Sequence, residues 1–146
     1  MKKVLFVCIH NSARSQMAEA FLNAYGGEQF KAESAGIEKG KLNPLVVASM
    51  LEAGIDISDN QTNEAFEFLK EGRKYDAVIT VCDAANAERC PVFPGKVKRI
   101  AWSFTDPSRF EGTEAEKLQQ ISVVREEIKD KVMAFIKEAG TSDYWQ

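Results

Sequence analysis

Residues 4–21 read VLFVCIHNSARSQMAEAF, and this stretch decides the fold. Its first four residues are apolar and prone to β-structure, so residues 3–7 are predicted to form a buried strand. From residue 15 to residue 25 apolar side chains recur at helical spacing, and Gly26-Gly27 ends that helix. The polar residues from Cys8 to Arg14 therefore form a loop that leaves a strand and enters a helix.

The rest of the chain alternates strand patterns with helix patterns. Further strands are predicted at residues 30–35, 75–81 and 97–102, and further helices at residues 43–54, 62–72 and 113–138. Asn43-Pro44 is a typical N-cap and first-turn pair, and Thr113 with Glu116 predicts a capping box. We expect residues 141–146 to be frayed.

Two of these helices have apolar faces that predict how they pack. The inner face of residues 62–72 is predicted to carry Phe66 and Leu69. The inner face of the last helix is predicted to carry Leu118, Ile121, Val124, Ile128, Val132 and Ile136.

Strands that alternate with helices predict an α/β fold, here one domain over residues 1–146. Four strands joined by right-handed crossovers favour a parallel sheet of order 2-1-3-4, with helices on both faces. Ligands of such sheets bind beyond the carboxyl ends of the strands, where the strand order reverses. Cys8, Cys82 and Asp106 follow the first, third and fourth strands, so all three are expected at that edge.

The loop after the first strand is suited to binding an oxyanion. Successive backbone N–H groups and the N-terminus of the following helix attract negative charge, and Arg14 offers a planar fork to a tetrahedral anion. The same surroundings favour the thiolate form of Cys8, to which the Ser15 hydroxyl can donate a hydrogen bond. Asn11 tolerates the left-handed backbone that a tight loop requires. The predicted oxyanion-binding residues are Ile9, His10, Asn11, Ser12, Ala13, Arg14 and Ser15.

Composition and motif chemistry exclude several other classes. The net charge of −3 argues against a nucleic-acid-binding protein, and the apolar runs are far shorter than the roughly 20 residues of a membrane span. The apolar N-terminal run stops at Cys8, unlike a signal peptide, so we expect a cytoplasmic protein. The loop lacks the glycines and the GK[ST] of a nucleotide-binding loop. Three cysteines without CxxC spacing indicate reactive or buried thiols rather than a structural disulfide framework.

The chain resembles the thioredoxin-coupled arsenate reductases of the low-molecular-weight protein tyrosine phosphatase superfamily. The resemblance rests on residues 8–20, which include the cysteine, five residues, arginine and serine of phosphatase-type loops, and on Ser34-Ala35-Gly36, Val81-Cys82-Asp83-Ala84-Ala85, Cys90-Pro91 and Trp102-Ser103-Phe104-Thr105-Asp106-Pro107. It covers nearly the whole chain and implies the fold of that superfamily.

The resemblance implies a mechanism that needs no cofactor. Cys8 would attack arsenate held by the loop and Arg14, while Asp106 would act as general acid. Cys82 would attack Cys8 to release arsenite, and Cys90 would move the disulfide to Cys82–Cys90, where thioredoxin would reduce it. Phosphate and sulfate would compete with arsenate. We expect Cys90 to be exposed, and residues 83–89, which lack a large apolar side chain, to unwind at modest cost.

Two other functions remain open for the same residues. A phosphotyrosine phosphatase would use Cys8, Arg14 and Asp106 but would not need Cys82 and Cys90. A sensor without catalytic turnover would bind phosphate or arsenate and form a disulfide. Loss of turnover after substitution of Cys82 or Cys90 would distinguish the reductase from the phosphatase, whereas a sensor would show no multiple turnover with any thiol donor.

Metal binding and the role of His10 leave further alternatives. Cys8, His10, Cys82 and Cys90 are all possible zinc ligands, but their spacing lacks the paired pattern of structural zinc sites. For His10 we expect a hydrogen bond that braces the loop, with a general base as the alternative. A monovalent-cation site of the kind some relatives have would use Asn11, Glu19, Ser34, Thr62 and Glu64.

Overall fold

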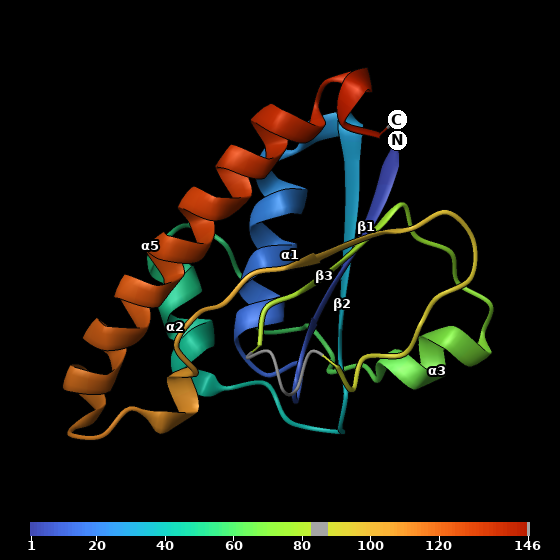
Figure 1. The fold of residues 1–146 in the computed structure, drawn as a ribbon. Coiled ribbons are helices and arrows are strands. Elements are labelled where there is room, and N and C mark those ends of the chain that lie inside the picture. The colour runs from blue at the N-terminus through green and yellow to red at the C-terminus, as the bar shows by residue number, and fades with distance from the viewer. Residues whose placement is uncertain (83–87, 146) are drawn as a thin grey trace.

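The computed structural model describes residues 1–82 and 88–145, and it places four parallel strands in one sheet. The strands are β1 (Lys2–Cys8), β2 (Phe30–Gly36), β3 (Ala77–Thr80) and β4 (Lys98–Ala101). Their order is β2-β1-β3-β4, and every pairing is parallel, which confirms the predicted sheet (Figure 1). Of the segment 83–89 that was predicted to unwind, residues 83–87 lie outside the described part of the chain.

Helices cover both sides of the sheet, as predicted. They are α1 (Arg14–Tyr25), α2 (Pro44–Glu52), α3 (Ala65–Lys70) and α5 (Glu114–Ala139), with 3-10 turns η1 (Gly27–Gln29), η2 (Pro107–Arg109) and η3 (Ser142–Trp145). Figure 1 shows α1, α2 and α5 on one side and α3 on the other. Among the described residues no helix combines the length and apolar character of a membrane span.

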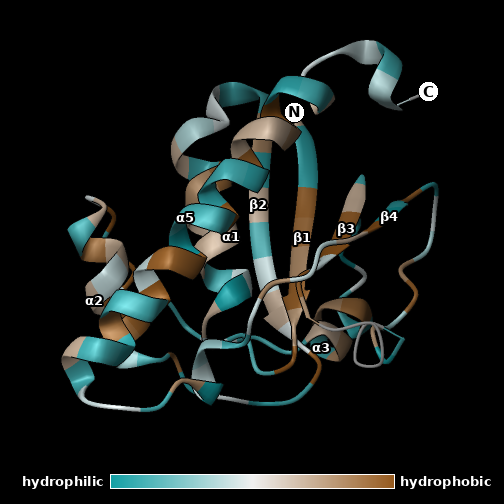
Figure 2. Cartoon of the chain, turned by 60° about the vertical axis from the view of Figure 1, so that its left-hand side comes forward, coloured by the Kyte–Doolittle hydropathy of each residue, from teal (hydrophilic) through white to brown (hydrophobic). Residues whose placement is uncertain are grey.

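The core forms around β1, the strand that has a neighbour on each side. Val4, Leu5, Phe6 and Val7 are completely buried, and the strand is hydrophobic along most of its length (Figure 2). A strand covered on both faces is apolar at consecutive positions, which is the pattern that made this stretch recognisable. Burying each such side chain contributes about 1.5–3 kcal/mol, so β1 is a rigid base for the loop that follows it.

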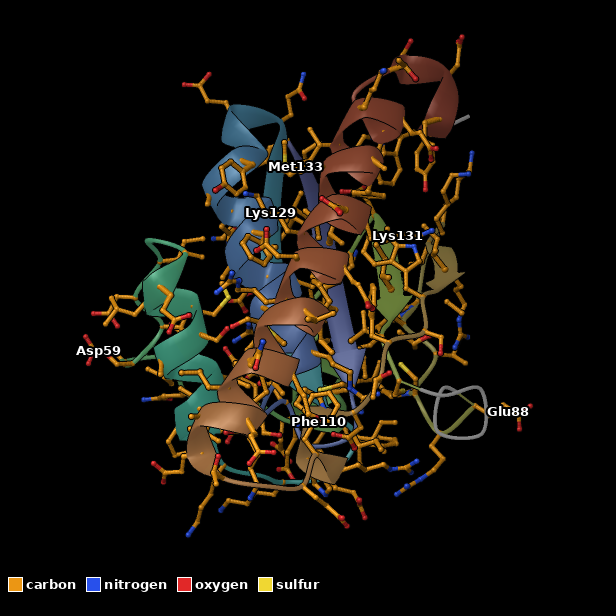
Figure 3. The ribbon with its side chains drawn as sticks, turned by 90° about the vertical axis from the view of Figure 1, so that its left-hand side faces the viewer. Asp59, Glu88, Phe110, Lys129, Lys131 and Met133 are labelled. Atoms are coloured by element: carbon orange, nitrogen blue, oxygen red, sulfur yellow. The ribbon has the colours of Figure 1, made fainter. Side chains whose placement is uncertain are left out.

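The long helix α5 begins and packs as its sequence indicates. The Thr113 hydroxyl accepts a hydrogen bond from the Glu116 backbone N–H, and the Glu116 carboxylate accepts one from the Thr113 N–H, which completes the capping box. The predicted positions from Ile121 to Val132 are buried. The buried face then continues through Phe135, which packs near Phe30 and Trp102. Lys129 and Lys131 flank this buried face, with their ammonium groups over the rings of Tyr25 and Trp102, and Met133 is exposed (Figure 3).

Two local predictions are wrong. Helix α3 starts at Ala65, later than expected, and it buries Phe68 while Phe66 is 46% exposed. The C-terminal residues are not frayed, because they are held in place as far as residue 145. The Trp145 indole N–H donates to the Ala139 carbonyl at 2.8 Å, and the Tyr144 ring packs edge-on against Phe135. Aromatic packing against the core, which periodicity does not detect, stabilises this end.

Candidate active site

The loop after β1 wraps around the sulfur of Cys8. The Cys8 Sγ lies 2.8 Å from the Ser15 Oγ and accepts a hydrogen bond from the Asn11 backbone N–H at 3.2 Å. Asn11 has a φ of +56°, the left-handed conformation that its sequence position predicted. The three side chains are buried, with Cys8 only 3% exposed. The loop therefore presents hydrogen-bond donors to the sulfur, as a stabilised thiolate requires.

A hydrogen-bond network fixes the orientation of the Asn11 side chain. Its Oδ1 accepts from the backbone N–H of Asn63 at 2.9 Å and from the Gln16 amide at 3.1 Å. Its Nδ2 therefore faces Ser15 and donates to the Oγ at 2.7 Å. Because the Ser15 oxygen already accepts this bond, its own proton is available to point at Cys8.

Two glycines allow the chain behind the loop to approach it closely. A Cβ atom on Gly36 would lie 2.7 Å from the His10 carbonyl carbon and 2.8 Å from the Asn11 nitrogen. A Cβ atom on Gly40 would lie 2.5 Å from the His10 carbonyl oxygen. This close approach allows two backbone hydrogen bonds. The Ile37 N–H donates to the Cys8 carbonyl, and the Glu38 N–H donates to the Ile9 carbonyl. Any larger residue would push the loop out of shape.

The N-terminus of α1 faces the loop without a competing negative charge. Its N-cap is Ala13, whose side chain makes no capping bond, and its first turn contains no acidic residue. The positive end of the helix dipole is thus available to an anion in the loop. Arg14, the first residue of the helix, adds a full charge at the same place.

Arg14 links the loop to the segment after β4. Its Nη1 donates to the Phe104 carbonyl at 3.2 Å, and its Nη2 lies 3.6 Å from the Asp106 Oδ2. The Arg14 side chain is 6% exposed and that of Asp106 is 23% exposed. Together with Thr105 and Arg109 these residues line a cavity of about 210 Å³. The predicted nucleophile, oxyanion clamp and acid thus belong to one end of the sheet.

Asp106 is ionised in the resting site. Burial alone would raise its pKa, but hydrogen bonds from the Ser108 backbone N–H (2.9 Å) and hydroxyl (2.8 Å) lower it. The nearby charges of Arg14 and Arg109 lower it further, and the net result is a pKa below the ordinary value. A general acid must hold a proton, so the role predicted for Asp106 requires it to gain one when substrate binds.

Cys82 follows β3 beside the end of β1. Val7 pairs with Thr80, and the Val81 N–H donates to the Val7 carbonyl at 2.8 Å. Cys82 therefore lies one residue beyond the position opposite Cys8, and both thiols are buried. The predicted Cys8–Cys82 disulfide requires the two Cα atoms to come within roughly 4.4–6.8 Å of each other.

Cys90 is buried, contrary to the prediction that it would be exposed. Its side chain is 5% exposed and its S–H donates to the Pro91 carbonyl at 3.6 Å. Pro91 and Phe93 are themselves buried, and Phe93 packs edge-on against Tyr75 at 5.3 Å. The polar residues before Cys90 suggested exposure, whereas the apolar residues after it carry it into the core. Burial raises the pKa of the Cys90 thiol to about 11, despite an opposing effect of Arg99.

Comparison with known proteins assigns this arrangement to a family. The family described as low molecular weight phosphotyrosine protein phosphatase matches residues 3–142. The chain belongs to that family. An arsenate reductase of Bacillus subtilis is 45% identical over 136 residues, which cover 92% of this chain and 94% of the relative.

Solved structures of the phosphatase family agree with this assignment. An arsenate reductase in its oxidized state superposes with a TM-score of 0.78 at 32% identity, covering 94% of this chain and 98% of that one. A thioredoxin-dependent arsenate reductase of Corynebacterium glutamicum gives a TM-score of 0.63 at 28% identity and covers 92% of this chain and 63% of its own. The relatives named here are thus reductases built on a phosphatase fold.

His10 lies at the outer surface of this phosphatase-family loop. Its side chain is 52% exposed, and its Nε2 is 3.4 Å from the Glu38 Oε2. The other oxygen of Glu38 is 3.4 Å from the Arg89 Nη2. The contact agrees with the bracing role, and Glu38 also joins the loop to the segment that carries Cys90.

The residues predicted for a cation site have protein partners. The Ser34 hydroxyl donates to the Glu19 carboxylate at 2.8 Å, and burial raises the pKa of Glu19. The Thr62 hydroxyl donates to the Gly40 carbonyl at 2.7 Å, and Glu64 is the N-cap of α3. In residues 1–82 and 88–145, no three histidine, cysteine or acidic side chains come together as metal ligands. Cation binding at these residues stays a prediction.

Several contributors to the site were not identified from sequence. They are Gln16, Gly36, Gly40, Asn63, Ser108 and Arg109, together with the carbonyl of Phe104. Gly36 directly follows the predicted second strand, and Ser108 sits two residues after Asp106 in an Asp-Pro-Ser turn. Those two signals were present in the sequence, whereas the contacts of Asn63 depend on the tertiary fold.

Proposed function

We propose that this protein reduces arsenate to arsenite, using Cys8 as nucleophile and Cys82 and Cys90 as the thiols that supply and pass on electrons. One observation carries the proposal. A cysteine surrounded by hydrogen-bond donors ends β1, and a second buried thiol follows the paired strand one step further on. A phosphatase needs the first cysteine, and only a redox reaction has a use for the second.

The first step uses the loop and the Arg14 fork to hold arsenate. The thiolate of Cys8 attacks arsenic and forms a sulfur–arsenic bond, while one arsenate oxygen leaves as water with a proton from Asp106. The helix N-terminus and Arg14 stabilise the negative charge on the remaining oxygens. The Ser15 hydroxyl lies 2.8 Å from the Cys8 sulfur and can donate a hydrogen bond to it before the attack.

The second and third steps are thiol–disulfide chemistry. Cys82 attacks the sulfur of Cys8, and the electron pair of the sulfur–arsenic bond passes to arsenic, which leaves as arsenite. Cys90 then attacks Cys82, which restores Cys8 and forms a Cys82–Cys90 disulfide. Cys90 is protonated and buried in the resting protein, so this last step requires its segment to move.

Substrate binding favours the uptake of a proton by Asp106. In the resting site the Ser108 hydrogen bonds, together with the charges of Arg14 and Arg109, keep the Asp106 pKa low. A bound dianion neutralises Arg14 and brings negative oxygens near the carboxylate, and both effects favour protonation. Asp106 thereby becomes an acid only when there is an oxyanion to receive its proton.

The partners follow from the same chemistry. Thioredoxin is the proposed electron donor, which agrees with the thioredoxin-dependent relative from Corynebacterium glutamicum. Phosphate and sulfate are proposed to compete with arsenate, and no cofactor is required. We place the protein in the cytoplasm, where thiols are kept reduced, and regard residues 1–146 as one domain.

Phosphotyrosine hydrolysis is the second candidate, because Cys8, Arg14 and Asp106 also suit that reaction and the family is named for it. Ser108 and Arg109 follow the Asp-Pro pair in η2. Neither residue offers the aromatic surface expected for a phenyl ring.

The deciding experiment couples the protein to thioredoxin, thioredoxin reductase and NADPH and follows NADPH oxidation after arsenate is added. The wild-type protein should turn over, whereas Cys8→Ser, Cys82→Ser and Cys90→Ser should each lose turnover. If the wild type is inactive while Cys82→Ser and Cys90→Ser still hydrolyse p-nitrophenyl phosphate, the reductase proposal is wrong and the phosphatase replaces it.

A further inference from the structure

The cavity beside the Cys8 loop contains a second guanidinium, that of Arg109. The cavity is lined by Arg14, Phe104, Thr105, Asp106 and Arg109. Arg109 ends the η2 turn, three residues after the acid, and it is exposed. The mechanism described above assigns no role to it.

The charge of Arg109 is not used in holding the fold together. Within residues 1–82 and 88–145, its side chain makes no hydrogen bond and no ion pair shorter than 4.0 Å. By contrast, Arg73 is bound by Glu33 at 2.7 Å, and Arg125 contacts Glu126 at 2.9 Å. The Arg109 guanidinium is therefore available to a ligand at no cost to existing contacts.

The cavity has an excess of positive charge. Arg14 and Arg109 contribute two charges against the single carboxylate of Asp106. The effect of Arg109 on the pKa of Asp106 shows that the two groups are within electrostatic reach. An oxyanion that enters the cavity at this end of the sheet meets a net positive charge. The overall charge of −3 would not predict this local excess.

A tetrahedral anion bound in the loop has one oxygen that the loop does not hold. This outer oxygen faces the positively charged side of the cavity. In an inorganic dianion this outer oxygen shares the negative charge, whereas in a phosphate ester it carries the organic group. A charge-assisted hydrogen bond from a guanidinium is therefore stronger at this position with the inorganic ion than with the ester.

We propose that Arg109 is a specificity-determining residue, whose guanidinium pairs with the outer oxygen of a small inorganic oxyanion and so favours arsenate and phosphate over aryl phosphate esters. The inference rests on the proposed function of the Cys8 site and names its substrate class. It assigns Arg109 to binding rather than to the chemical step.

The test compares Arg109→Ala and Arg109→Lys with Lys137→Ala. Lys137 is exposed in the last turn of α5, at the other end of a helix whose 26 residues span about 39 Å, so its loss changes the net charge equally without touching the site. All three substitutions are on the surface, and circular dichroism checks that each variant is folded.

The first measurement needs no turnover. Inorganic phosphate should protect Cys8 of the wild type from iodoacetamide, with the modified peptide counted by mass spectrometry. The dissociation constant for phosphate should rise about tenfold in Arg109→Ala and about threefold in Arg109→Lys, and it should change less than about twofold in Lys137→Ala. Wild-type affinity in Arg109→Ala would overturn the inference.

The second measurement tests specificity by steady-state kinetics. In Arg109→Ala the KM for arsenate should rise about tenfold while kcat stays within about twofold, and kcat/KM for p-nitrophenyl phosphate should change less than about twofold. An equal loss for both substrates would show that Arg109 does not discriminate between them.

The outcomes separate this inference from the function on which it rests. If phosphate fails to protect Cys8 even in the wild type, the oxyanion site itself is wrong. If phosphate protects the wild type and Arg109→Ala equally, only the role of Arg109 is wrong. If the phosphate affinities differ as expected but thioredoxin supports no turnover, Arg109 keeps its role and the reductase proposal fails.

Discussion

The Ser15 Oγ lies 2.8 Å from the Cys8 Sγ and accepts a hydrogen bond from the Asn11 side-chain amide, which leaves its own proton available to the sulfur. Ser15→Ala removes this bond and leaves the sulfur with the Asn11 backbone N–H. The sulfur then has one hydrogen-bond donor fewer, so alkylation of Cys8 by iodoacetamide at pH 7 should slow by about three- to tenfold. In urea, where the loop is unfolded, both proteins should react at the same rate. An unchanged rate in the folded protein would mean that the hydroxyl does not stabilise the thiolate.

The Ser108 hydroxyl stabilises the ionised form of Asp106. Because the folded-state pKa of Asp106 is lowered, its stabilising effect is present above the unfolded value of about 3.9 and is lost as the pH falls through the folded value. Ser108→Ala removes the hydroxyl bond at 2.8 Å but keeps the backbone bond. It should cost about 0.5–1 kcal/mol of unfolding free energy at pH 7 and almost nothing near pH 2, as measured by urea denaturation. A cost independent of pH would contradict this explanation.

The two ends of the Arg14 guanidinium contact different groups, the Phe104 carbonyl and the Asp106 carboxylate. A lysine ammonium cannot make both contacts and also face an oxyanion. Arg14→Lys should lower kcat/KM for arsenate by about a hundredfold and weaken phosphate protection of Cys8 to a similar extent. Near-normal kinetics in this variant would exclude Arg14 as the oxyanion clamp.

The sequence predicts the local geometry of the site better than its tertiary support. The run from Val4 to Val7 and the capping box at Thr113 are local patterns, and the structure confirms both. Asn11 and its φ of +56° could also be predicted because a short polar loop had to turn tightly. The bond between Asn11 and Asn63 joins residues 52 positions apart, and no spacing rule encodes it.

The incorrect prediction for Cys90 has the same origin. Its immediate neighbours are polar before it and mixed after it, so local composition indicated a surface thiol. The nearby Phe93 is buried against the ring of Tyr75, and this contact joins the segment after Cys90 to the residues just before β3. Tertiary packing overrides local composition in such cases.

Gly36 lies so close to the oxyanion loop that a methyl group cannot be added there. A Cβ atom would be 2.7–2.8 Å from backbone atoms of His10, Asn11 and Glu38, none of which can rotate away. Gly36→Ala should cost about 1–3 kcal/mol of unfolding free energy and weaken phosphate binding, because the loop must shift. Thermal denaturation with and without phosphate measures both effects. Wild-type phosphate affinity would show that the loop tolerates the displacement.

Glu38 joins His10 of the loop to Arg89 of the segment that carries Cys90. All three side chains are about half exposed, so the contacts are weak, of the order of 0.2–1 kcal/mol. Glu38→Gln should therefore let this segment open more often and raise the alkylation rate of Cys90 by at most about fivefold. Glu28→Gln, which alters an acidic residue in η1, is the control. A slower rate in Glu38→Gln would show that the contact opens the segment rather than holding it closed.

The burial of Cys90 also determines how the protein meets oxidants. Peroxides react with thiolates, and a thiol with a pKa of about 11 inside the core is almost never in that form. In the resting protein the Cys90 thiol, the last electron donor of the proposed relay, is thus protected from peroxide and from disulfides in solution. In the proposed relay the segment has to open before Cys90 reacts, so this thiol would donate its electrons after substrate turnover rather than to oxidants in solution.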